Sequence, residues 1–344
     1  MIQLRIGILN GGGDCAGLNA VTRGVLRAAE VRGDDVIGIR RGWAGLLERD
    51  TVTLKYDDFE YLVGEGGTEL ETSRTNPLKR DKGLDTVARN ISSLGLDVLI
   101  AVGGDDTLGV ARELSAMGQK VIGVPKTIDN DLAGTDYSFG FFTAVDEAMK
   151  MIESLQTTGR SHSRIMVVEV MGRDAGWISL YAGTAAGANM IMIPEFSGTA
   201  DDAVKLVRER RSRGKNSTVI VVAEGVNLVP RGKAEKDEFG HELFAKAPGE
   251  SNASYLARYI EERTGYETRS TVLGHTIRGT RPNSYDRVMT SRLGIRAVEA
   301  AHSGKFGVMV AISGASVVEV PLAEGTKKKY VDGSTWKELN QFFV

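Results

Sequence analysis

VLIAVGGDDT, residues 98–107, is an apolar run that ends in two glycines and two adjacent carboxylates. The unbroken apolar stretch predicts a strand that is buried on both faces, because a half-buried strand would alternate polar and apolar residues. The glycine pair predicts a turn at the end of that strand. In open parallel sheets ligands bind beyond the carboxyl ends of the strands, so Asp105 and Asp106 are candidate functional residues.

Apolar runs alternate with segments of helical period along most of the chain, which predicts an α/β fold of two doubly wound, mostly parallel sheets in two Rossmann-like lobes. The predicted strands are 4–9, 36–39, 97–102, 121–124, 165–170, 190–193, 219–223 and 308–312. The predicted helices are 18–32, 108–117, 139–155, 176–186, 203–213, 254–263 and 285–301. Residues 226–250 are polar and are expected to form a surface excursion. The KKK stretch at 327–329 is expected to be a solvated turn, followed by an amphipathic helix.

The composition excludes several classes of protein. The 344 residues carry a net charge of −2, which gives no general case for nucleic-acid or membrane binding. The single cysteine, Cys15, rules out an intrachain disulfide and is expected to be a small buried side chain. The four histidines lack metal-ligand spacing, so no zinc site is expected. No apolar run approaches the roughly 18 residues of a membrane span, and the first residues do not resemble a signal peptide, so we expect a cytoplasmic protein.

The first loop, GGGDCAG (residues 11–17), follows a predicted strand and precedes a predicted helix. Backbone N–H groups and the helix N-terminus make such a loop an anion site, although a tight turn without ligand is the alternative. Gly11-x-Gly13-x-x-Ala16 also matches a loose dinucleotide fingerprint, which leaves an oxidoreductase as a weak alternative. The acidic residue expected at the end of the second strand is missing, because that strand ends in Arg40-Arg41. No GxxxxGKS or GxxxxGKT motif is present, so a P-loop is excluded.

The loop after the next strand, PKTIDND (residues 125–131), also delivers carboxylates to the same sheet edge. Four acids and one lysine in two short loops call for a compensating cation or a role in proton transfer. Mg²⁺ binds one or two carboxylates together with phosphate oxygens, and a hydroxyl nucleophile needs a carboxylate base. Solvated turn and cap residues are the alternative, but two loops of matched chemistry favour a functional site.

These segments occur in order with TSRTNP, SHSR, VVEVMGRDAGW, AEG and ETRSTVLGHTIRG, and the set spans residues 11–279. Together they resemble the phosphofructokinase family, and GGDDT with PKTIDND is similar to its pyrophosphate-dependent members. The resemblance implies reversible, Mg²⁺-dependent phosphoryl transfer from pyrophosphate to fructose 6-phosphate, in glycolysis or gluconeogenesis. Cys15-Ala16 departs from the alanine–proline pair that is common in this loop of the family.

The resemblance also implies roles for the residues of the donor half. Asp129 would be the base that takes the proton of the sugar C1 hydroxyl, and Thr127 would hold the transferring phosphoryl group. Asp105 would anchor Mg²⁺, Gly12 would offer a backbone N–H to the phosphoryl group, and Arg173 would stabilise its charge.

Two positions bear on the donor. ATP-using relatives commonly have glycine at the positions of Asp106 and Lys126. A carboxylate at 106 would crowd and repel an α-phosphate, and Lys126 would place an ammonium against the donor phosphate, which favours pyrophosphate over ATP. Arg74 matches a further donor-phosphate contact, and Asp131 would be a supporting or sugar-side acid.

The sugar half is implied by motifs later in the chain. The expected contacts to the sugar or its 6-phosphate are Met171, Gly172, Glu224, His275 and Arg278. Arg164 and Arg269 match positions that reach into a neighbouring subunit, which implies a homodimer or homotetramer with shared sites. We expect a larger donor and Mg²⁺ lobe at 1–140 plus 278–330, a smaller sugar-phosphate lobe at 141–277, and a C-terminal tail at 331–344.

Three alternatives remain open at this point. The donor could be ATP, or the acceptor range could extend to sedoheptulose 7-phosphate. The chain could also be an inactive regulatory subunit of the same fold, although such a subunit is expected to have lost the base or the metal acid, and Asp105, Asp129 and Arg173 are all present.

Overall fold

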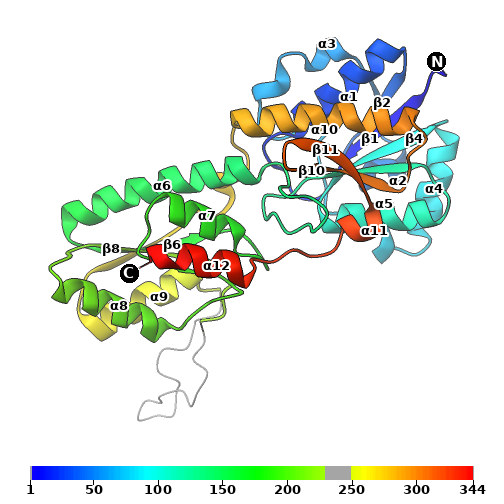
Figure 1. The fold of residues 1–344 in the computed structure, drawn as a ribbon. Coiled ribbons are helices and arrows are strands. Elements are labelled where there is room, and N and C mark those ends of the chain that lie inside the picture. Colours follow the sequence, from blue (N-terminus) through cyan, green and yellow to red (C-terminus); the bar gives the residue numbers. More distant parts are fainter. Residues whose placement is uncertain (1, 229–248, 344) are drawn as a thin grey trace. The chain divides into compact units, whose positions relative to one another are not determined.

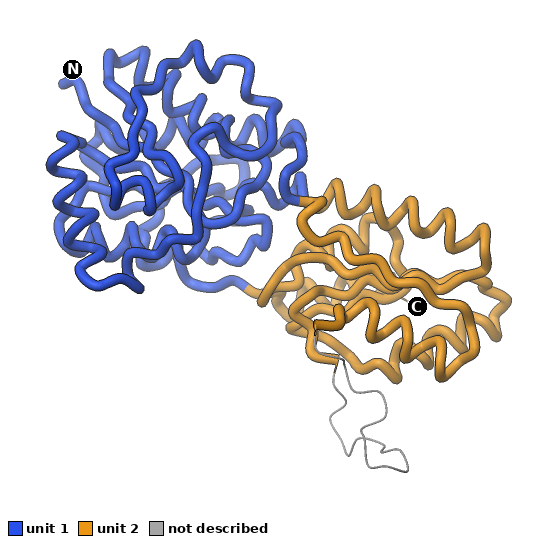
Figure 2. Tube along the Cα trace, turned by 180° about the vertical axis from the view of Figure 1, so that it is seen from behind, with its two compact units in different colours: residues 1–144, 278–329 blue, residues 145–277, 330–344 orange. Residues whose placement is uncertain are grey.

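The computed structural model describes residues 2–228 and 249–343. The chain divides into two compact units, which Figure 2 colours separately. Unit 1 comprises residues 1–144 and 278–329, and unit 2 comprises residues 145–277 and 330–344. The C-terminal segment, expected as a separate tail, therefore belongs to unit 2. Most of the expected polar excursion, residues 229–248, lies outside the described residues.

Unit 1 is built on a seven-stranded sheet of order β11-β10-β5-β4-β1-β2-β3 (Figure 1). Its strands are β1 (Arg5–Asn10), β2 (Asp35–Ile39), β3 (Thr51–Leu54), β4 (Val98–Gly103), β5 (Val121–Pro125), β10 (Val308–Ser313) and β11 (Ser316–Pro321). The five inner strands pair in parallel, as the buried apolar runs predicted. The two edge strands pair antiparallel and were not predicted. Both are partly exposed, so neither has the continuous apolar run that marked the inner strands.

Helices cover this sheet. They are α1 (Leu18–Arg32), α2 (Trp43–Glu48), α3 (Tyr56–Phe59), α4 (Gly83–Ser93), α5 (Asp105–Ala116), α10 (Ser284–His302) and α11 (Leu322–Gly325), with 3₁₀ turns η1 (Leu62–Gly64) and η2 (Pro77–Lys79). Helices α1 and α10 lie side by side, and glycines at their contact allow the two backbones to approach closely (Figure 1). A Cβ at Gly24 would lie 2.4 Å from the carbonyl oxygen of Ser291, and one at Gly294 would lie 2.3 Å from that of Val21.

Unit 2 has a four-stranded, fully parallel sheet of order β7-β8-β6-β9. Its strands are β6 (Ile165–Val170), β7 (Met190–Met192), β8 (Thr218–Ala223) and β9 (Thr268–Val272). Its helices are α7 (Trp177–Ala185), α8 (Ala200–Ser212), α9 (Asn252–Thr264) and α12 (Gly333–Leu339), with 3₁₀ turns η3 (Gly274–Ile277) and η4 (Asn340–Phe342). α6 (Phe141–His162) begins in unit 1 and continues in unit 2. β6 and β8 are buried along their whole length, whereas β9 is largely exposed and was not predicted.

The start of α5 corrects the sequence prediction. The helix was expected from residue 108, with GGDDT as a loop, but it begins at Asp105 with Gly104 as its extended N-cap residue. Asp105 and Asp106 therefore stand in the first turn of a helix, where the partial positive charge of the helix N-terminus stabilises carboxylates. This charge reduces the repulsion between two adjacent acids at the end of a buried strand.

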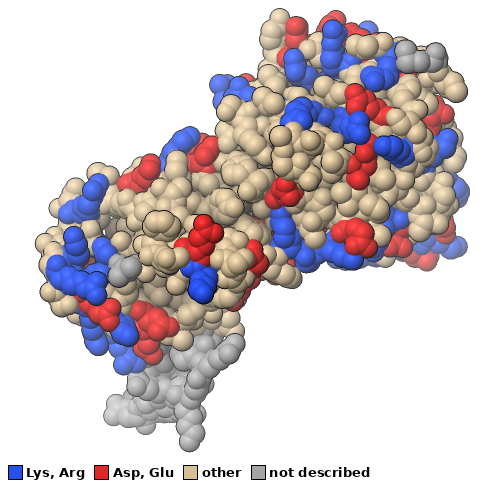
Figure 3. All heavy atoms as spheres, viewed as in Figure 1, with Lys and Arg blue, Asp and Glu red and all other residues tan. Residues whose placement is uncertain are grey.

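The surface agrees with the near-neutral net charge. On the face shown in Figure 3, Lys and Arg are interspersed with Asp and Glu rather than gathered into one field. Within the described residues, no helix combines the length and the apolar character that crossing a bilayer requires.

Candidate active site

Three loops meet at the carboxyl edge of the unit 1 sheet, because β1, β4 and β5 are neighbours in it. The backbone N–H of Gly11 donates to the carbonyl oxygen of Val102 at 2.9 Å, and that of Lys126 donates to Gly103 at 2.9 Å. The ammonium of Lys126 reaches the carbonyl oxygen of Gly13 at 2.5 Å. The structure thus brings together the glycine loop, GGDDT and PKTIDND.

The glycine loop packs against two cations. A Cβ at Gly13 would lie 2.3 Å from Nη1 of Arg278, which donates to the carbonyl oxygen of Asp14 at 2.9 Å. Among the described residues, Nε of Arg278 is a buried donor without a hydrogen-bond partner. Gly12 has φ 84°, and a Cβ there would lie 3.3 Å from Nζ of Lys126. Glycine at these positions allows the close approach of both cations.

The N–H group of Gly12, which the family resemblance assigns to the phosphoryl group, has a backbone partner in this structure. In this structure the Gly12 N–H donates to the carbonyl oxygen of Ser73 at 3.0 Å. Ser73 lies in the same segment as Arg74, which is exposed, and Asn76, whose side-chain amide donates to Asp106 at 3.3 Å. The TSRTNP segment therefore borders both the glycine loop and the start of α5.

Lys126 is only 4% exposed. Burial lowers the pKa of its ammonium, Arg278 lowers it further, and the negative charges of Asp129 and Asp14 oppose the shift. Cys15 is fully buried, as expected, and burial raises the pKa of its thiol to about 12, so the thiol stays protonated at neutral pH.

The loop after β5 is held in one conformation by its own hydrogen bonds. The N–H of Asp129 donates to Oγ1 of Thr127 at 3.1 Å, and the hydroxyl of Ser138 donates to the carbonyl oxygen of Thr127 at 2.6 Å. Asn130 has a left-handed backbone, φ 52°, and its side-chain oxygen accepts from the N–H of Ser138 at 3.1 Å. Thr127 and Asp129, the expected phosphoryl contact and base, are half-buried on this fixed loop.

The KKK prediction was wrong for two of the three lysines. Lys327 is exposed and pairs with Glu324, as a solvated turn would. Lys328 bonds Oδ2 of Asp105 at 2.9 Å and Oδ2 of Asp131 at 2.5 Å. Burial lowers the pKa of Lys328, but the hydrogen bonds to Asp131 and Asp105 raise it, and the net shift is upward.

Lys329 also points into the structure. Its ammonium donates to the side chain of Asn130 at 3.0 Å and to the carbonyl oxygens of Thr135 and Asp136, each at 2.9 Å. Burial lowers its pKa to about 8, and the charges of Asp136 and Asp131 oppose that shift. The excess of acids in the two loops indicated that a positive charge compensates them, but it did not point to Lys328 or Lys329.

The donor set at this edge fits Mg²⁺ bound together with phosphate. Within residues 2–228 and 249–343, no group of three or more His, Cys, Asp or Glu residues could hold a metal by itself. The ammonium of Lys328 is a stand-in cation, and it shows that oxygens of Asp105 and Asp131 can both contact one positive centre. Two carboxylates with phosphate oxygens are the ligands that Mg²⁺ accepts in phosphate sites.

In unit 2, the loop after β6 and the turn after β8 are adjacent because these strands pair. Oε1 of Glu224 accepts the N–H of Arg173 at 3.0 Å and that of Gly172 at 3.4 Å. Arg173 has φ 46°, a left-handed conformation that costs about 1–3 kcal/mol in a non-glycine residue. Glu224, expected to touch the sugar, thus also holds the backbone of the loop that carries Met171, Gly172 and Arg173.

A second carboxylate supports the same loop. Glu195, which was not singled out from the sequence, accepts the N–H of Gly176 at 3.1 Å and that of Val331 at 3.0 Å. It therefore connects the loop to the C-terminal segment of unit 2. A glutamate in a polar connection carries no sequence signal for this role.

The two arginines expected to reach a neighbouring subunit share one acid. Glu267 contacts Arg164 at 2.8 Å and Arg269 at 2.5 Å. The hydrogen bond from Arg164 is the main cause that lowers the pKa of Glu267. His275 is exposed in η3 of unit 2, whereas Arg278, its expected partner, belongs to unit 1.

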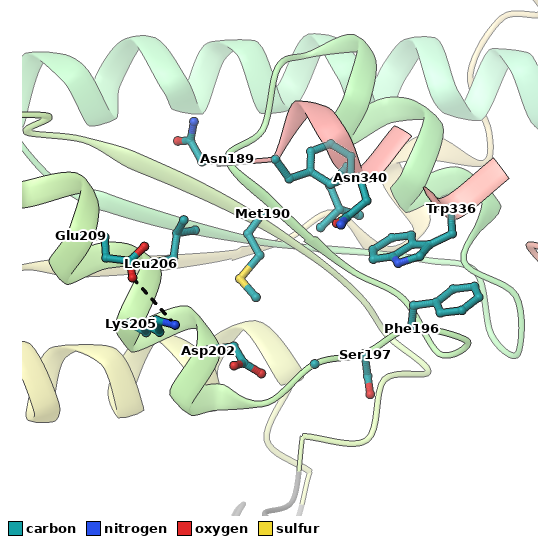
Figure 4. Close-up of a pocket in the computed structure, with 13 residues that line it drawn as sticks. Asn189, Met190, Phe196, Ser197, Asp202, Lys205, Leu206, Glu209, Trp336 and Asn340 are labelled. Atoms are coloured by element: carbon teal, nitrogen blue, oxygen red, sulfur yellow. Dashed lines mark ion pairs between the residues drawn. The ribbon is translucent and has the colours of Figure 1, made fainter. Parts of the chain in front are cut away.

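A separate hollow of about 330 Å³ lies in unit 2 and contains none of the predicted site residues. Figure 4 shows Trp336 of α12 beside Phe196, with ring centroids 5.1 Å apart, and the ion pair of Lys205 and Glu209 on α8. Of its lining residues that the structure describes, only Lys205 is a cation, so the hollow does not have the character of a phosphate site.

Comparison with known proteins agrees with this description. A model of the family described as Phosphofructokinase matches residues 5–301. The pyrophosphate–fructose 6-phosphate 1-phosphotransferase of Amycolatopsis methanolica is 49% identical over 348 residues, which cover 99% of this chain and 100% of that protein. The ATP-dependent 6-phosphofructokinase 3 of Streptomyces coelicolor is 45% identical over 329 residues, which cover 94% of this chain and 95% of that protein.

A solved structure confirms the predicted fold. The crystal structure of the pyrophosphate-dependent phosphofructokinase from Marinobacter aquaeolei superposes with a TM-score of 0.83 at 22% identity, covering 100% of this chain and 92% of that one. The sequence motifs, the family model and the full-length relatives agree, and the chain belongs to the phosphofructokinase family.

Proposed function

We propose that the chain transfers a phosphoryl group from inorganic pyrophosphate to the C1 hydroxyl of fructose 6-phosphate, giving fructose 1,6-bisphosphate and phosphate. The observation that carries the donor assignment is the exposed carboxylate of Asp106 in the first turn of α5. Lys126, whose side chain is buried, lies on the neighbouring loop, and its backbone N–H bonds Gly103 at the end of the strand before α5. The full-length relative from Amycolatopsis methanolica, named for this reaction, supports it.

The chemistry is divided among residues of the loop after β5 and Arg173 of the loop after β6. The carboxylate of Asp129 takes the proton of the C1 hydroxyl as the new C1 oxygen–phosphorus bond forms. The bridging phosphorus–oxygen bond of pyrophosphate breaks, and the electron pair leaves with the inorganic phosphate. Thr127 and Lys126 hold the transferring group, and Arg173 stabilises its charge.

Gly12 would offer its backbone N–H to the transferring phosphoryl group in place of the Ser73 carbonyl oxygen, and it also leaves space for Lys126. A side chain there would press against Nζ of Lys126 at 3.3 Å and would be strained at φ 84°. Asp105 would hold Mg²⁺, with Asp131 beside it as a supporting acid, and the bound ion would neutralise the charge of the donor oxygens.

Donor choice follows from volume and charge at position 106. A carboxylate on the exposed side of the first turn of α5 occupies the space that an α-phosphate would need, and it repels that phosphate. Pyrophosphate has no third phosphate and no nucleoside, so it avoids the conflict. Arg74, on the segment that contacts both neighbouring loops, adds a donor contact.

The proposed acceptor contacts come from the motifs that lie later in the chain. Met171, Gly172 and Glu224 contact the sugar, and His275 and Arg278 bind its 6-phosphate. Arg164 and Arg269 are half-exposed and serve the site of a neighbouring subunit, so we propose a homodimer or homotetramer in the cytoplasm.

The test is a coupled aldolase assay with fructose 6-phosphate and equal concentrations of pyrophosphate or ATP. Wild type is expected to use pyrophosphate, and Asp106→Gly is expected to gain ATP activity. Asp106→Asn, which keeps the volume and removes the charge, separates the two contributions. If wild type uses ATP as well as pyrophosphate, the argument from position 106 is wrong.

ATP as the donor is the second candidate, because the relative from Streptomyces coelicolor is named for ATP at 45% identity. The same assay decides between the two donors. Replacing fructose 6-phosphate with sedoheptulose 7-phosphate in a pyrophosphate-consumption assay measures the acceptor range.

A further inference from the structure

Lys328 joins two acids that the sequence delivers from different strands. Asp105 follows β4 at the start of α5, and Asp131 lies in the loop after β5. Nζ of Lys328 lies 2.9 Å from Oδ2 of Asp105 and 2.5 Å from Oδ2 of Asp131. The side chain of Asp131 is only 8% exposed and that of Lys328 is 30% exposed, so this contact is poorly screened by water.

The backbone around Lys328 is fixed independently of that contact. The N–H of Ala133 donates to the carbonyl oxygen of Lys327 at 2.8 Å, and the N–H of Lys329 donates to that of Asp131 at 2.9 Å. Leu132 and Lys328 form an isolated antiparallel bridge between these bonds. Together with the three acceptors of the Lys329 ammonium, these contacts attach the segment to the loop without the charge of Lys328.

The charge of Lys328 therefore acts chiefly on the two carboxylates. With the ammonium in place, the Asp105 and Asp131 side chains share one positive charge instead of repelling each other. A divalent cation that approaches Asp105 meets this ammonium at the same carboxylate oxygen, and the two cations repel each other at short range.

We propose that Lys328 is a positioning residue of the metal site, which keeps Asp105 and Asp131 together without metal and moves off Asp105 when a divalent cation binds. The inference rests on the proposed role of Asp105 as the metal anchor. Its consequence is that the cation binds weakly by itself and gains affinity when it arrives with pyrophosphate, whose oxygens then accept the released ammonium.

The first test titrates Mn²⁺ alone, without pyrophosphate or sugar, and follows the free ion by electron paramagnetic resonance. Lys328→Gln keeps a hydrogen-bonding side chain without the charge and is expected to bind Mn²⁺ about tenfold more tightly than wild type. Lys327→Gln is the matched control, because Lys327 is exposed and pairs with Glu324, and it should bind like wild type. Equal or weaker binding by Lys328→Gln would overturn the inference.

The variant Asp105→Asn distinguishes a failure of the role proposed for Lys328 from a failure of the role of Asp105 as the metal anchor. If Asp105→Asn loses Mn²⁺ binding while Lys328→Gln binds like wild type, the anchor stands and only the role of Lys328 fails. If Asp105→Asn binds Mn²⁺ like wild type, the anchor fails and this inference fails with it.

A second measurement needs no variant. Wild-type protein is acetylated briefly with and without Mg²⁺ alone, and the modified lysines are quantified by peptide mass spectrometry. Mg²⁺ is expected to increase acetylation of Lys328 severalfold and to leave Lys327 unchanged. Acetylation of Lys328 that does not respond to Mg²⁺ contradicts the displacement.

Discussion

Gly13→Ala tests whether the glycine loop sets the position of Arg278. The new Cβ would lie 2.3 Å from Nη1, 3.1 Å from Cζ and 3.6 Å from Nη2 of Arg278. The guanidinium would have to move by more than about 1 Å to restore normal contact. Gly13 does not have a left-handed backbone, so alanine adds volume there without backbone strain.

The expected result is a large rise in the KM for fructose 6-phosphate. Displacing Arg278 breaks its 2.9 Å hydrogen bond to Asp14 and misaligns the charge-assisted bonds proposed to the 6-phosphate. Such bonds contribute about 1.5–3 kcal/mol each, which corresponds to about a 10- to 100-fold rise in KM. The KM for pyrophosphate and the melting temperature should change little, because the clash is with the flexible end of a side chain.

The KM for fructose 6-phosphate, measured by steady-state kinetics, shows whether Gly13→Ala acts through Arg278. Four proteins are compared: wild type, Gly13→Ala, Arg278→Ala and the double variant. If the alanine acts through Arg278, the double variant resembles Arg278→Ala and the effects are not additive. Gly109→Ala is the matched control, because a Cβ there meets nothing within 4 Å. An unchanged KM in Gly13→Ala, or additive effects, would refute the reasoning.

Three further predictions concern stability and loop geometry. Asp286→Ala should lower the free energy of unfolding, measured in urea, by about 3–5 kcal/mol. The reason is that this fully buried carboxylate accepts from the N–H of Gly140 at 3.1 Å and from the N–H of Thr143 at 2.9 Å. A decrease below about 1 kcal/mol would contradict the expected cost of leaving these two buried N–H groups without a partner. The raised pKa of Cys15 contributes stability that is present below pH 9.0 and is lost as pH rises toward about 12. Comparing wild type with Cys15→Ala at pH 7 and pH 10.5 checks this sign, and the alanine variant should lose less stability. Glu224→Ala should raise the KM for fructose 6-phosphate far more than Glu224→Gln, whose amide oxygen can still accept the N–H of Arg173; equal effects would show that charge, not loop support, matters.

The inner strands and most helices could be predicted because their signal is local. A strand covered on both faces must be apolar along its length, and α1 was predicted with the bounds that the structure shows. The edge strands and β9 were not predicted because they are partly exposed to solvent, and their composition therefore resembles that of loops. α4 was also missed, although Leu84, Val87 and Ile91 repeat at helical spacing.

Only part of the candidate active site could be predicted from the sequence. The loops that meet at the sheet edge could be identified because parallel strands place their carboxyl ends together. Glu195 and the inward-pointing Lys329 could not, because a carboxylate in a connection and a lysine in a basic run carry no local mark of their partners.

The sequence by itself determined the fold class, the family and the meeting of three loops at one edge, since these depend on apolar period and on motifs read along the chain. Only the tertiary structure decided which charges meet. Asp105 and Lys328 are far apart in sequence, and the contact between them depends on how the end of unit 1 crosses the loop after β5. Electrostatic contacts act through space over a few ångströms, so the partner of a charge becomes known only when the chain is folded.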